Sequence, residues 1–185
     1  MVGENNMRYA KIDEFETVNG EQIGMSLYVQ GCHFRCPNCF NSDTWNFNGG
    51  NEWNENIRKK FLELAGRDYI KRISILGGCP LTKENRQDVM HLICDLKNRY
   101  PEKQIWVYTG YTWEEIYFAN NEIVHSHNRD RFERYVTISD VDVLVDGRFE
   151  EELKDITLPW RGSSNQRVID VQKSLKEGKV ILHCK

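Results

Sequence analysis

The sequence predicts an α/β fold built around a mostly parallel sheet. Short runs rich in Val, Ile, Leu and Tyr alternate along the chain with stretches whose apolar residues recur at helical spacing. Two of the short runs end in glycine, as strands of such folds often do where a ligand site follows. No repeat, low-complexity stretch or linker divides the 185 residues, a length that suits one compact domain. We therefore expect a single domain over residues 1–185.

Five segments have the length and composition of strands buried between two layers. The second and third of them run into Gly77-Gly78 and Gly110, where small residues let a ligand approach the backbone closely. Alternatively, these glycines serve only tight turns into the next helices. The predicted strands are Ser26–Gln30, Arg72–Leu76, Gln104–Thr109, Val141–Val145 and Arg167–Val171.

Helical spacing predicts the intervening helices. Trp53–Ala65 carries one apolar face and ends before Gly66, a residue typical of helix C-terminal caps. Lys83–Tyr100 shows the same spacing until Pro101 ends it, because proline cannot continue a helix. A third, shorter helix is expected to start at Thr112, where Thr-Trp-Glu-Glu fits a capping box. A further helix is expected within residues 120–137.

Composition excludes several classes of protein. A hydrophobic fraction of 39% and a charged fraction of 29% are ordinary for a globular chain, and a net charge of −3 argues against binding nucleic acid. No apolar run is long enough to cross a bilayer, and the first residues lack the pattern of a secretory signal. We expect a cytoplasmic protein without membrane partners, whose six cysteines serve metal binding or catalysis rather than disulfides.

Three of the cysteines form a cluster in sequence. Cys32, Cys36 and Cys39 follow the first predicted strand with the spacing C-x₃-C-x₂-C, and a loop allows all three sulfurs to converge on one centre. Thiolates are the usual ligands of iron–sulfur clusters and of structural zinc. Three cysteines would leave one iron of a four-iron cluster open to a substrate. The alternative is a closed zinc site completed by His33 or a distant residue, which would make the protein an interaction module.

The other cysteines lie outside this loop. Cys94 falls beside the apolar face of the second long helix and is expected to be a packed, buried thiol. Cys184 stands next to the C-terminus and is expected to fray with it. Cys79 directly follows the Gly-Gly turn after the second predicted strand.

The cysteine triplet after a first strand, with a Gly-Gly turn after a second, resembles the radical S-adenosylmethionine superfamily. Further segments narrow the resemblance to the activating enzymes of anaerobic (class III) ribonucleotide reductases, over roughly residues 8 to 172. These segments are Gln30-Gly31-Cys32, Cys39-Phe40-Asn41, Thr44-Trp45, Trp106–Tyr111, Val143–Gly147 and Arg161–Gln166.

This resemblance implies a partial, open (β/α) barrel that binds a [4Fe-4S] cluster and S-adenosylmethionine. Enzymes of the superfamily cleave S-adenosylmethionine reductively to methionine and a 5′-deoxyadenosyl radical. In this family the radical takes a hydrogen atom from a glycine near the C-terminus of the reductase. The implied partners are the catalytic subunit of the anaerobic reductase and a one-electron donor such as flavodoxin. The resemblance is also compatible with a homodimer. The cofactors carry the difficult chemistry, so no acid–base dyad is required.

Carried over to this chain, the resemblance implies that Cys32, Cys36 and Cys39 hold the cluster. The segment Arg161–Gln166 either orders the site or meets the reductase, or is simply a capped turn. Residues expected at the S-adenosylmethionine pocket are Asn38, Cys39 and Phe40 on the adenine side, Gly77, Gly78 and Cys79 on the methionine side, and Thr109 with Gly110 closing the pocket.

Cys79 departs from the family pattern, which has Glu or Asp after Gly77-Gly78. A thiol is a weak acceptor, so a charge-assisted hydrogen bond to the ligand's ammonium group, worth about 1.5–3 kcal/mol, is missing. We expect this to weaken S-adenosylmethionine binding by about 10–100-fold. The alternative is that Cys79 ligates the open iron in the resting state and competes with the substrate.

A different function within the same superfamily stays open at this point. Such an enzyme would act on a small molecule, as a modified-nucleoside synthase does. Incubation with S-adenosylmethionine and a reductant, with and without the reductase, separates the two functions.

Overall fold

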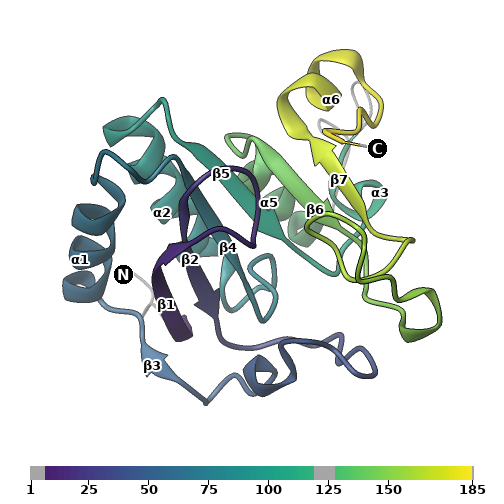
Figure 1. Ribbon diagram of the computed structural model, residues 1–185, viewed down its shortest axis with the longest axis horizontal. Coiled ribbons are helices and arrows are strands. Elements are labelled where there is room, and N and C mark those ends of the chain that lie inside the picture. The colour runs from purple at the N-terminus through teal and green to yellow at the C-terminus, as the bar shows by residue number, and fades with distance from the viewer. Residues whose placement is uncertain (1–6, 119–127, 185) are drawn as a thin grey trace.

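The computed structural model describes residues 7–118 and 128–184, and these form one seven-stranded sheet with helices and loops around it (Figure 1). The strands are β1 (Arg8–Glu16), β2 (Gly24–Val29), β3 (Asn51–Glu52), β4 (Arg72–Gly77), β5 (Gln104–Tyr108), β6 (Val143–Asp146) and β7 (Arg167–Asp170). The helices are α1 (Glu55–Ala65), α2 (Arg86–Arg99), α3 (Trp113–Ile116), α5 (Arg129–Ile138) and α6 (Val171–Glu177), with short 3₁₀ turns η1 (Ser42–Thr44) and η2 (Glu151–Leu153).

The strand order is β3-β1-β2-β4-β5-β6-β7. The four central strands β2, β4, β5 and β6 run parallel. Antiparallel strands flank them, with β1 between β2 and β3 on one side and β7 beside β6 on the other. The predicted α/β class with a mostly parallel sheet is confirmed, and the sheet is open over the described residues.

All five predicted strands are present, each within two residues of the expected ends. Strand β1 was not predicted, because its sequence mixes charged and apolar residues and all of it is half-buried or exposed. Strand β3 has only two residues and carries no pattern of its own. Strand β7 pairs antiparallel with β6, and the connection between them, residues 147–166, contains the 3₁₀ turn η2 but no α-helix that could serve as a crossover.

The predicted helices are confirmed, with shifted starts. Helix α1 begins after Asn54, whose side chain accepts hydrogen bonds from the backbone amides of Asn56 and Ile57, each at 3.1 Å. The capping box at Thr112 is present, since the Glu115 carboxylate accepts from the Thr112 amide at 2.8 Å. Of the helix expected within 120–137, α5 covers the later part, and residues 120–127 lie outside the described residues.

The two faces of the sheet differ in what covers them. Because side chains alternate along a strand, Ile73, Ile105 and Leu144 point to one face and join the main core, which helices α1, α2 and α5 cover (Figure 1). The opposite face carries a smaller cluster of Trp106, Val143, Val145 and Val168. Loops instead of helices cover this second face, which we call the loop face.

A buried arginine holds one of these loops in place. The Arg72 side chain is fully buried and forms an ion pair with Glu16 at 2.7 Å. It also donates to the backbone carbonyls of Asn19 at 2.7 Å and Glu21 at 2.9 Å. Gly20 has a φ of +133°, and a Cβ there would lie 2.5 Å from the Arg72 side chain. The Arg72 side chain, from β4, therefore fixes the position of residues 17–23 over the loop face.

Two expectations about single cysteines are wrong. Cys94 is exposed, because the buried face of α2 runs through Val89, Leu92 and Leu96 and leaves the sulfur on its solvent side. Cys184 does not fray, because the His183 amide donates to the Val168 carbonyl at 2.8 Å and ties this end of the chain to β7. Its half-buried thiol packs against the Trp106 cluster.

None of the helices within the described ranges has both the length and the apolar character that crossing a membrane requires.

Candidate active site

A cavity of about 530 Å³ lies on the loop face at the carboxyl ends of the parallel strands. Its floor takes one side chain from each of the four: Tyr28 from β2, Leu76 from β4, Tyr108 from β5 and Val145 from β6. The register of the sheet sets these side chains side by side, since Tyr28 pairs with Leu76 and Tyr108 with Val145. Ligands of open α/β sheets bind at this end of the strands, so the cavity is the candidate site.

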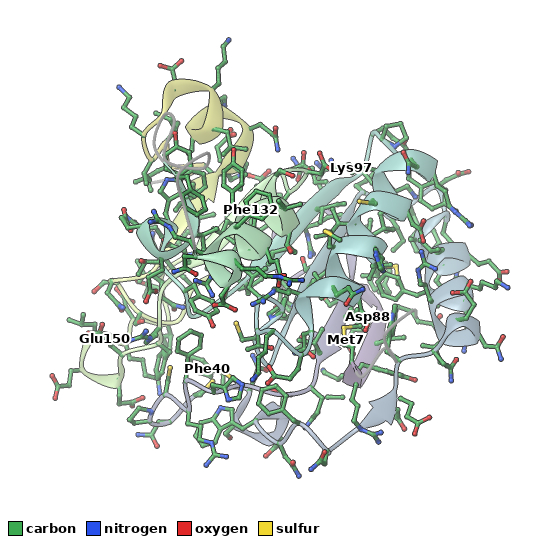
Figure 2. All side chains as sticks on the ribbon, turned by 180° about the vertical axis from the view of Figure 1, so that it is seen from behind. Met7, Phe40, Asp88, Lys97, Phe132 and Glu150 are labelled. Carbon is green, nitrogen blue, oxygen red and sulfur yellow. The ribbon has the colours of Figure 1, made fainter. Side chains whose placement is uncertain are left out.

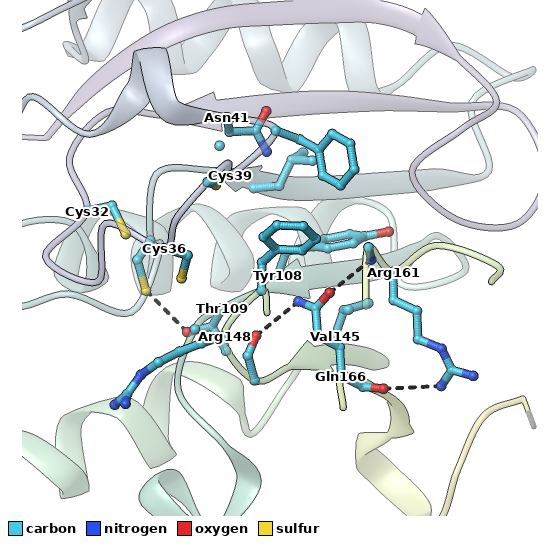
Figure 3. A pocket seen from close by; sticks show the side chains of 18 of the residues that line it. Cys32, Cys36, Cys39, Asn41, Tyr108, Thr109, Val145, Arg148, Arg161 and Gln166 are labelled. Carbon is cyan, nitrogen blue, oxygen red and sulfur yellow. Dashed lines mark hydrogen bonds between the residues drawn. The ribbon is translucent and has the colours of Figure 1, made fainter. Parts of the chain in front are cut away.

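The three clustered cysteines meet at one end of this cavity (Figure 3). Each is half-buried in the loop that follows β2. Arg35 and Asn38, which precede Cys36 and Cys39, have φ angles of +48° and +54°. These left-handed residues bend the loop twice and bring all three thiols to the cavity, a conformation that non-glycine residues adopt only at a cost.

Backbone hydrogen bonds fix the base of the cysteine loop. The Gly31 amide donates to the Thr44 carbonyl at 2.7 Å, and the Cys32 amide donates to the Trp45 carbonyl at 3.1 Å. From the other side, the Cys79 amide donates to the Gly31 carbonyl at 2.8 Å. The loop is therefore held between the segment that follows it and the end of β4.

Burial and hydrogen bonding act in opposite directions on the pKa values of Cys32 and Cys36. Burial, and then the nearby Cys79, raises the pKa of Cys32, while the backbone amides of Phe34 and Arg35 act in the opposite direction. Burial likewise raises the pKa of Cys36, opposed by the Phe149 amide. Metals bind the thiolate form, which burial disfavours. A bound metal group must therefore stabilise the thiolates by its positive charge, and its binding releases the thiol protons.

The glycines that follow β4 and β5 allow close contact with the cysteine loop. A Cβ on Gly78 would lie 2.4 Å from the Gly31 carbonyl oxygen, and one on Gly110 would lie 2.5 Å from the Phe34 ring. Gly77 has a φ of +100°, which favours glycine. These glycines thus let the strand ends and the cysteine loop share one cavity.

Most of the predicted pocket residues line the cavity. They are Cys39, Phe40, Gly77, Gly78, Cys79, Thr109 and Gly110. Asn38 does not line it; its side chain is exposed, and its left-handed backbone helps to bend the loop.

Cys79 is a buried thiol within the same wall. Its Sγ lies 3.2 Å from the Thr109 hydroxyl, and the side chain is only 1% exposed. Burial raises the pKa of Cys79, although the Thr109 hydroxyl and the backbone amides of Gly110 and Leu81 act against this. Of the described residues that line the cavity, two are arginines, Arg148 and Arg161, and none is acidic.

The three thiols at one end of the cavity are a donor set of the kind that iron–sulfur clusters use. His33, the residue that could complete a zinc site, does not line the cavity. His33 turns instead to the Glu84 carboxylate at 3.1 Å and packs on the Phe47 ring. In a four-iron cluster each cysteine binds a different iron, so three thiols spread around one end of a cavity suit it.

The segment Arg161–Gln166 is a capped turn that also forms a wall of the cavity. The Gln166 side chain accepts from the amides of Gly162 at 2.9 Å and Ser163 at 3.2 Å, and it donates to the Gly147 carbonyl at 3.0 Å (Figure 3). Arg161, Gly162 and Gln166 line the cavity. The structure thus shows a capped turn that borders the cavity.

Several lining residues were not predicted. Arg148 and Phe149 follow β6, and the Arg148 guanidinium lies 4.8 Å from the centre of the Phe34 ring. Phe149 packs on Phe40 with ring centres 5.3 Å apart. The sequence offers no local signal for Arg148 and Phe149, because the stretch between Gly147 and Arg161 has neither strand nor helix spacing.

Comparison with known proteins agrees with this geometry. A family described as "4Fe-4S single cluster domain" matches residues 18–169. The three thiols above a mostly parallel open sheet, together with this match, define a protein of the single-cluster iron–sulfur class.

Curated relatives narrow the class. A protein of Enterobacteria phage T4 is 34% identical over 162 residues, covering 88% of this chain and 93% of its own length. Proteins of Salmonella typhi and Escherichia coli K12 are 36% and 35% identical over 164 residues, covering 88% of this chain and 97% of their own. All three are named anaerobic ribonucleoside-triphosphate reductase-activating protein, and this chain belongs to that family. The family predicted from the sequence is thereby confirmed.

Proposed function

We propose that this chain is a radical S-adenosylmethionine enzyme that activates an anaerobic ribonucleotide reductase by forming a glycyl radical on it. One observation carries the proposal: Cys32, Cys36 and Cys39 meet at one end of a cavity above four parallel strands. When bound, the [4Fe-4S] cluster and S-adenosylmethionine supply a 5′-deoxyadenosyl radical that takes a hydrogen atom from a glycine near the reductase C-terminus. The open sheet with its site at the strand ends supports a partial (β/α) barrel of the radical S-adenosylmethionine type.

The residues of this chain position the cofactors and exclude water. Cys32, Cys36 and Cys39 would hold the cluster, and the backbone of Gly77-Gly78 would border the methionine part of S-adenosylmethionine. Apolar walls of Leu76, Val145 and the aromatic rings keep water from a radical site, which prevents its loss in side reactions. Phe40 borders the adenine side in this proposal.

Cys79 shapes how S-adenosylmethionine binds. Its thiol is buried and engaged with Thr109, which favours a passive replacement of the family carboxylate over ligation of the open iron. The ammonium group of the ligand then lacks an acidic partner, since none of the described lining residues is acidic. The proposal includes a one-electron donor such as flavodoxin. It also includes a homodimer, which a measurement of molecular mass in solution tests.

Anaerobic reconstitution tests the function. The wild-type protein should contain iron and sulfide, cleave S-adenosylmethionine when reduced, and produce a glycyl radical signal in electron paramagnetic resonance only when the reductase is present. Cys39→Ala should lose cluster and radical together. Zinc in place of iron and sulfide would contradict the proposal. Cleavage without any radical on the reductase would favour an enzyme acting on a small molecule.

A further inference from the structure

We propose that the mouth of the cavity is the docking surface for the glycine-bearing segment of the reductase, an inference that rests on the proposed function. The surface, which we call the apolar rim, consists of Val18, Phe40 and Ile156, with Arg161 beside them. The segment that fits it brings apolar side chains and at least one carboxylate next to its glycine.

Exposed apolar side chains gather at this mouth. Val18 is 70% exposed, Phe40 63% and Ile156 84%, and all three line the cavity. They come from three separate loops: the one between β1 and β2, the cysteine loop, and the one after η2. Single exposed apolar residues are ordinary, but three from distant parts of the chain around one cavity mark an interaction site.

Packing on Trp106 brings two of the three loops together. A Cβ on Gly20, in the Val18 loop, would lie 2.9 Å from the Trp106 ring. Trp160, in the chain segment that follows Ile156, packs edge-on against Trp106 with ring centres 5.1 Å apart. Both loops are thus anchored by the same buried side chain.

Phe40 joins this surface through the neighbouring turn. A Cβ on Gly162 would lie 2.8 Å from the Phe40 ring, and Phe149 packs on the other part of it. The Lys154 ammonium lies 5.3 Å from the centre of the same ring. The apolar rim is therefore continuous with the wall that reaches the cysteines.

Arg161 supplies a charge that forms no ion pair within residues 7–118 and 128–184. Its Nε is buried without a hydrogen-bond partner, and its Nη1 donates to the Gln166 backbone carbonyl at 3.3 Å. Asp155 lies within electrostatic reach but accepts hydrogen bonds from Thr157 at 2.6 and 2.8 Å. A carboxylate on the incoming segment would form an ion pair with the Arg161 guanidinium, a group that pairs readily with carboxylates.

The two ends of the cavity suit two occupants. Figure 3 shows Arg161 at the opposite end from Cys32 and Cys36. The cysteine end would hold the cofactors, which leaves the Arg161 end for the polypeptide. A glycine has no side chain, so an extended segment can bring its backbone between the walls while its neighbouring side chains rest on the apolar rim.

Paired substitutions test this surface. Ile156→Asp and Val18→Ser should each weaken binding of the intact reductase by about tenfold or more, measured by anaerobic titration calorimetry. Arg161→Gln should weaken binding and reduce its dependence on salt, because one ion pair is lost. The matched controls are Leu182→Asp and Phe132→Ser, exposed apolar residues that do not line the cavity; Figure 2 shows Phe132 well apart from Phe40. The controls should bind as the wild type does.

The outcomes separate this inference from the function on which it rests. Iron content and the circular dichroism spectrum of each variant show that the fold and the cluster are intact. Rim variants that bind the reductase as tightly as the wild type, or controls that weaken as much as the rim variants, would overturn the docking surface. A wild-type protein that binds the reductase through the rim but forms no glycyl radical would contradict the proposed function alone.

Discussion

Cys79 stands where the sequence resemblance leads us to expect a carboxylate. It is buried against Thr109, and burial raises its pKa, which disfavours the charged thiolate. A neutral thiol neither attracts an ammonium group nor binds iron without first losing its proton. Both consequences can be measured on a protein that carries its cluster.

We expect Cys79→Glu to strengthen S-adenosylmethionine binding by about 10–100-fold, because a carboxylate restores a charge-assisted hydrogen bond. Titration of the reconstituted protein, followed by the change in its cluster signal, measures this. Cys79→Ser is the matched control and should leave the signal of the substrate-free cluster unchanged. A changed signal in Cys79→Ser would instead indicate that the Cys79 sulfur is an iron ligand.

At the scale of elements, the Arg72–Glu16 pair joins β4 to the end of β1 and to the loop that carries Val18. The guanidinium is fully buried, and only 8% of the Glu16 side chain is exposed. Removing one partner of a buried pair leaves the other charged and unsatisfied, whereas the intact pair contributes little over an apolar replacement. The pair thus specifies where the loop lies.

Arg72→Leu is expected to lower the free energy of unfolding by about 3–5 kcal/mol, since Glu16 stays buried without its partner. Urea denaturation of the cluster-free protein measures it. The double variant Arg72→Leu with Glu16→Leu should recover part of the loss. A single variant as stable as the wild type would show that the Glu16 carboxylate relaxes into water.

The same pair predicts a pH dependence. Burial acts to raise the pKa of Glu16, but hydrogen bonds from Arg72, the Asn19 amide and Ser26 bring it below its usual value. A lowered folded-state pKa gives stability that is present above the unfolded-state pKa and is lost as pH falls through the folded-state value. Thermal unfolding from pH 7 to pH 3 should therefore show a larger loss for the wild type than for Glu16→Gln. Equal losses would mean that the ion pair contributes no acid sensitivity.

The sequence predicted the elements whose burial produces a pattern of apolar residues. It missed the elements whose position is set by contacts with distant parts of the chain. Strands β2, β4 and β5 are apolar because they are covered on both faces, so their composition identified them. Strand β1 lies beside the parallel strands, between β2 and β3, and its place depends on pairing with β2, a long-range contact that local spacing does not encode. The cysteine triplet was predicted because its spacing is a local pattern. Arg148, Phe149 and the contacts of Arg72 with residues 17–23 were not, because they depend on long-range packing.

At the scale of the whole molecule, stability and chemistry occupy opposite faces of the sheet. The main core lies under α1, α2 and α5, whereas the cysteine loop and the cavity lie on the loop face and at the strand ends. Only Cys32 of the three clustered cysteines packs against that core. We therefore expect the helical side to fold without the cluster.

Removal of iron by a chelator under anaerobic conditions should leave the circular dichroism spectrum nearly unchanged. The thiols of Cys32, Cys36 and Cys39 should become reactive toward a thiol reagent, because they are half-buried at an open cavity. Cys94, which is exposed, should react in both forms and serves as the internal control. Loss of helical signal on iron removal would show that the cluster is needed for the fold.

The cavity floor has a consequence for how this protein can change over time. Tyr28, Leu76, Tyr108 and Val145 face the cavity only because their neighbours along each strand face the helices. A slip of any strand by one position would exchange the two sets and expose apolar core residues, so selection for a stable interior also preserves which side chains line the cavity. Substitutions in the core beneath the helices are thus constrained by the same geometry that keeps the cavity floor constant.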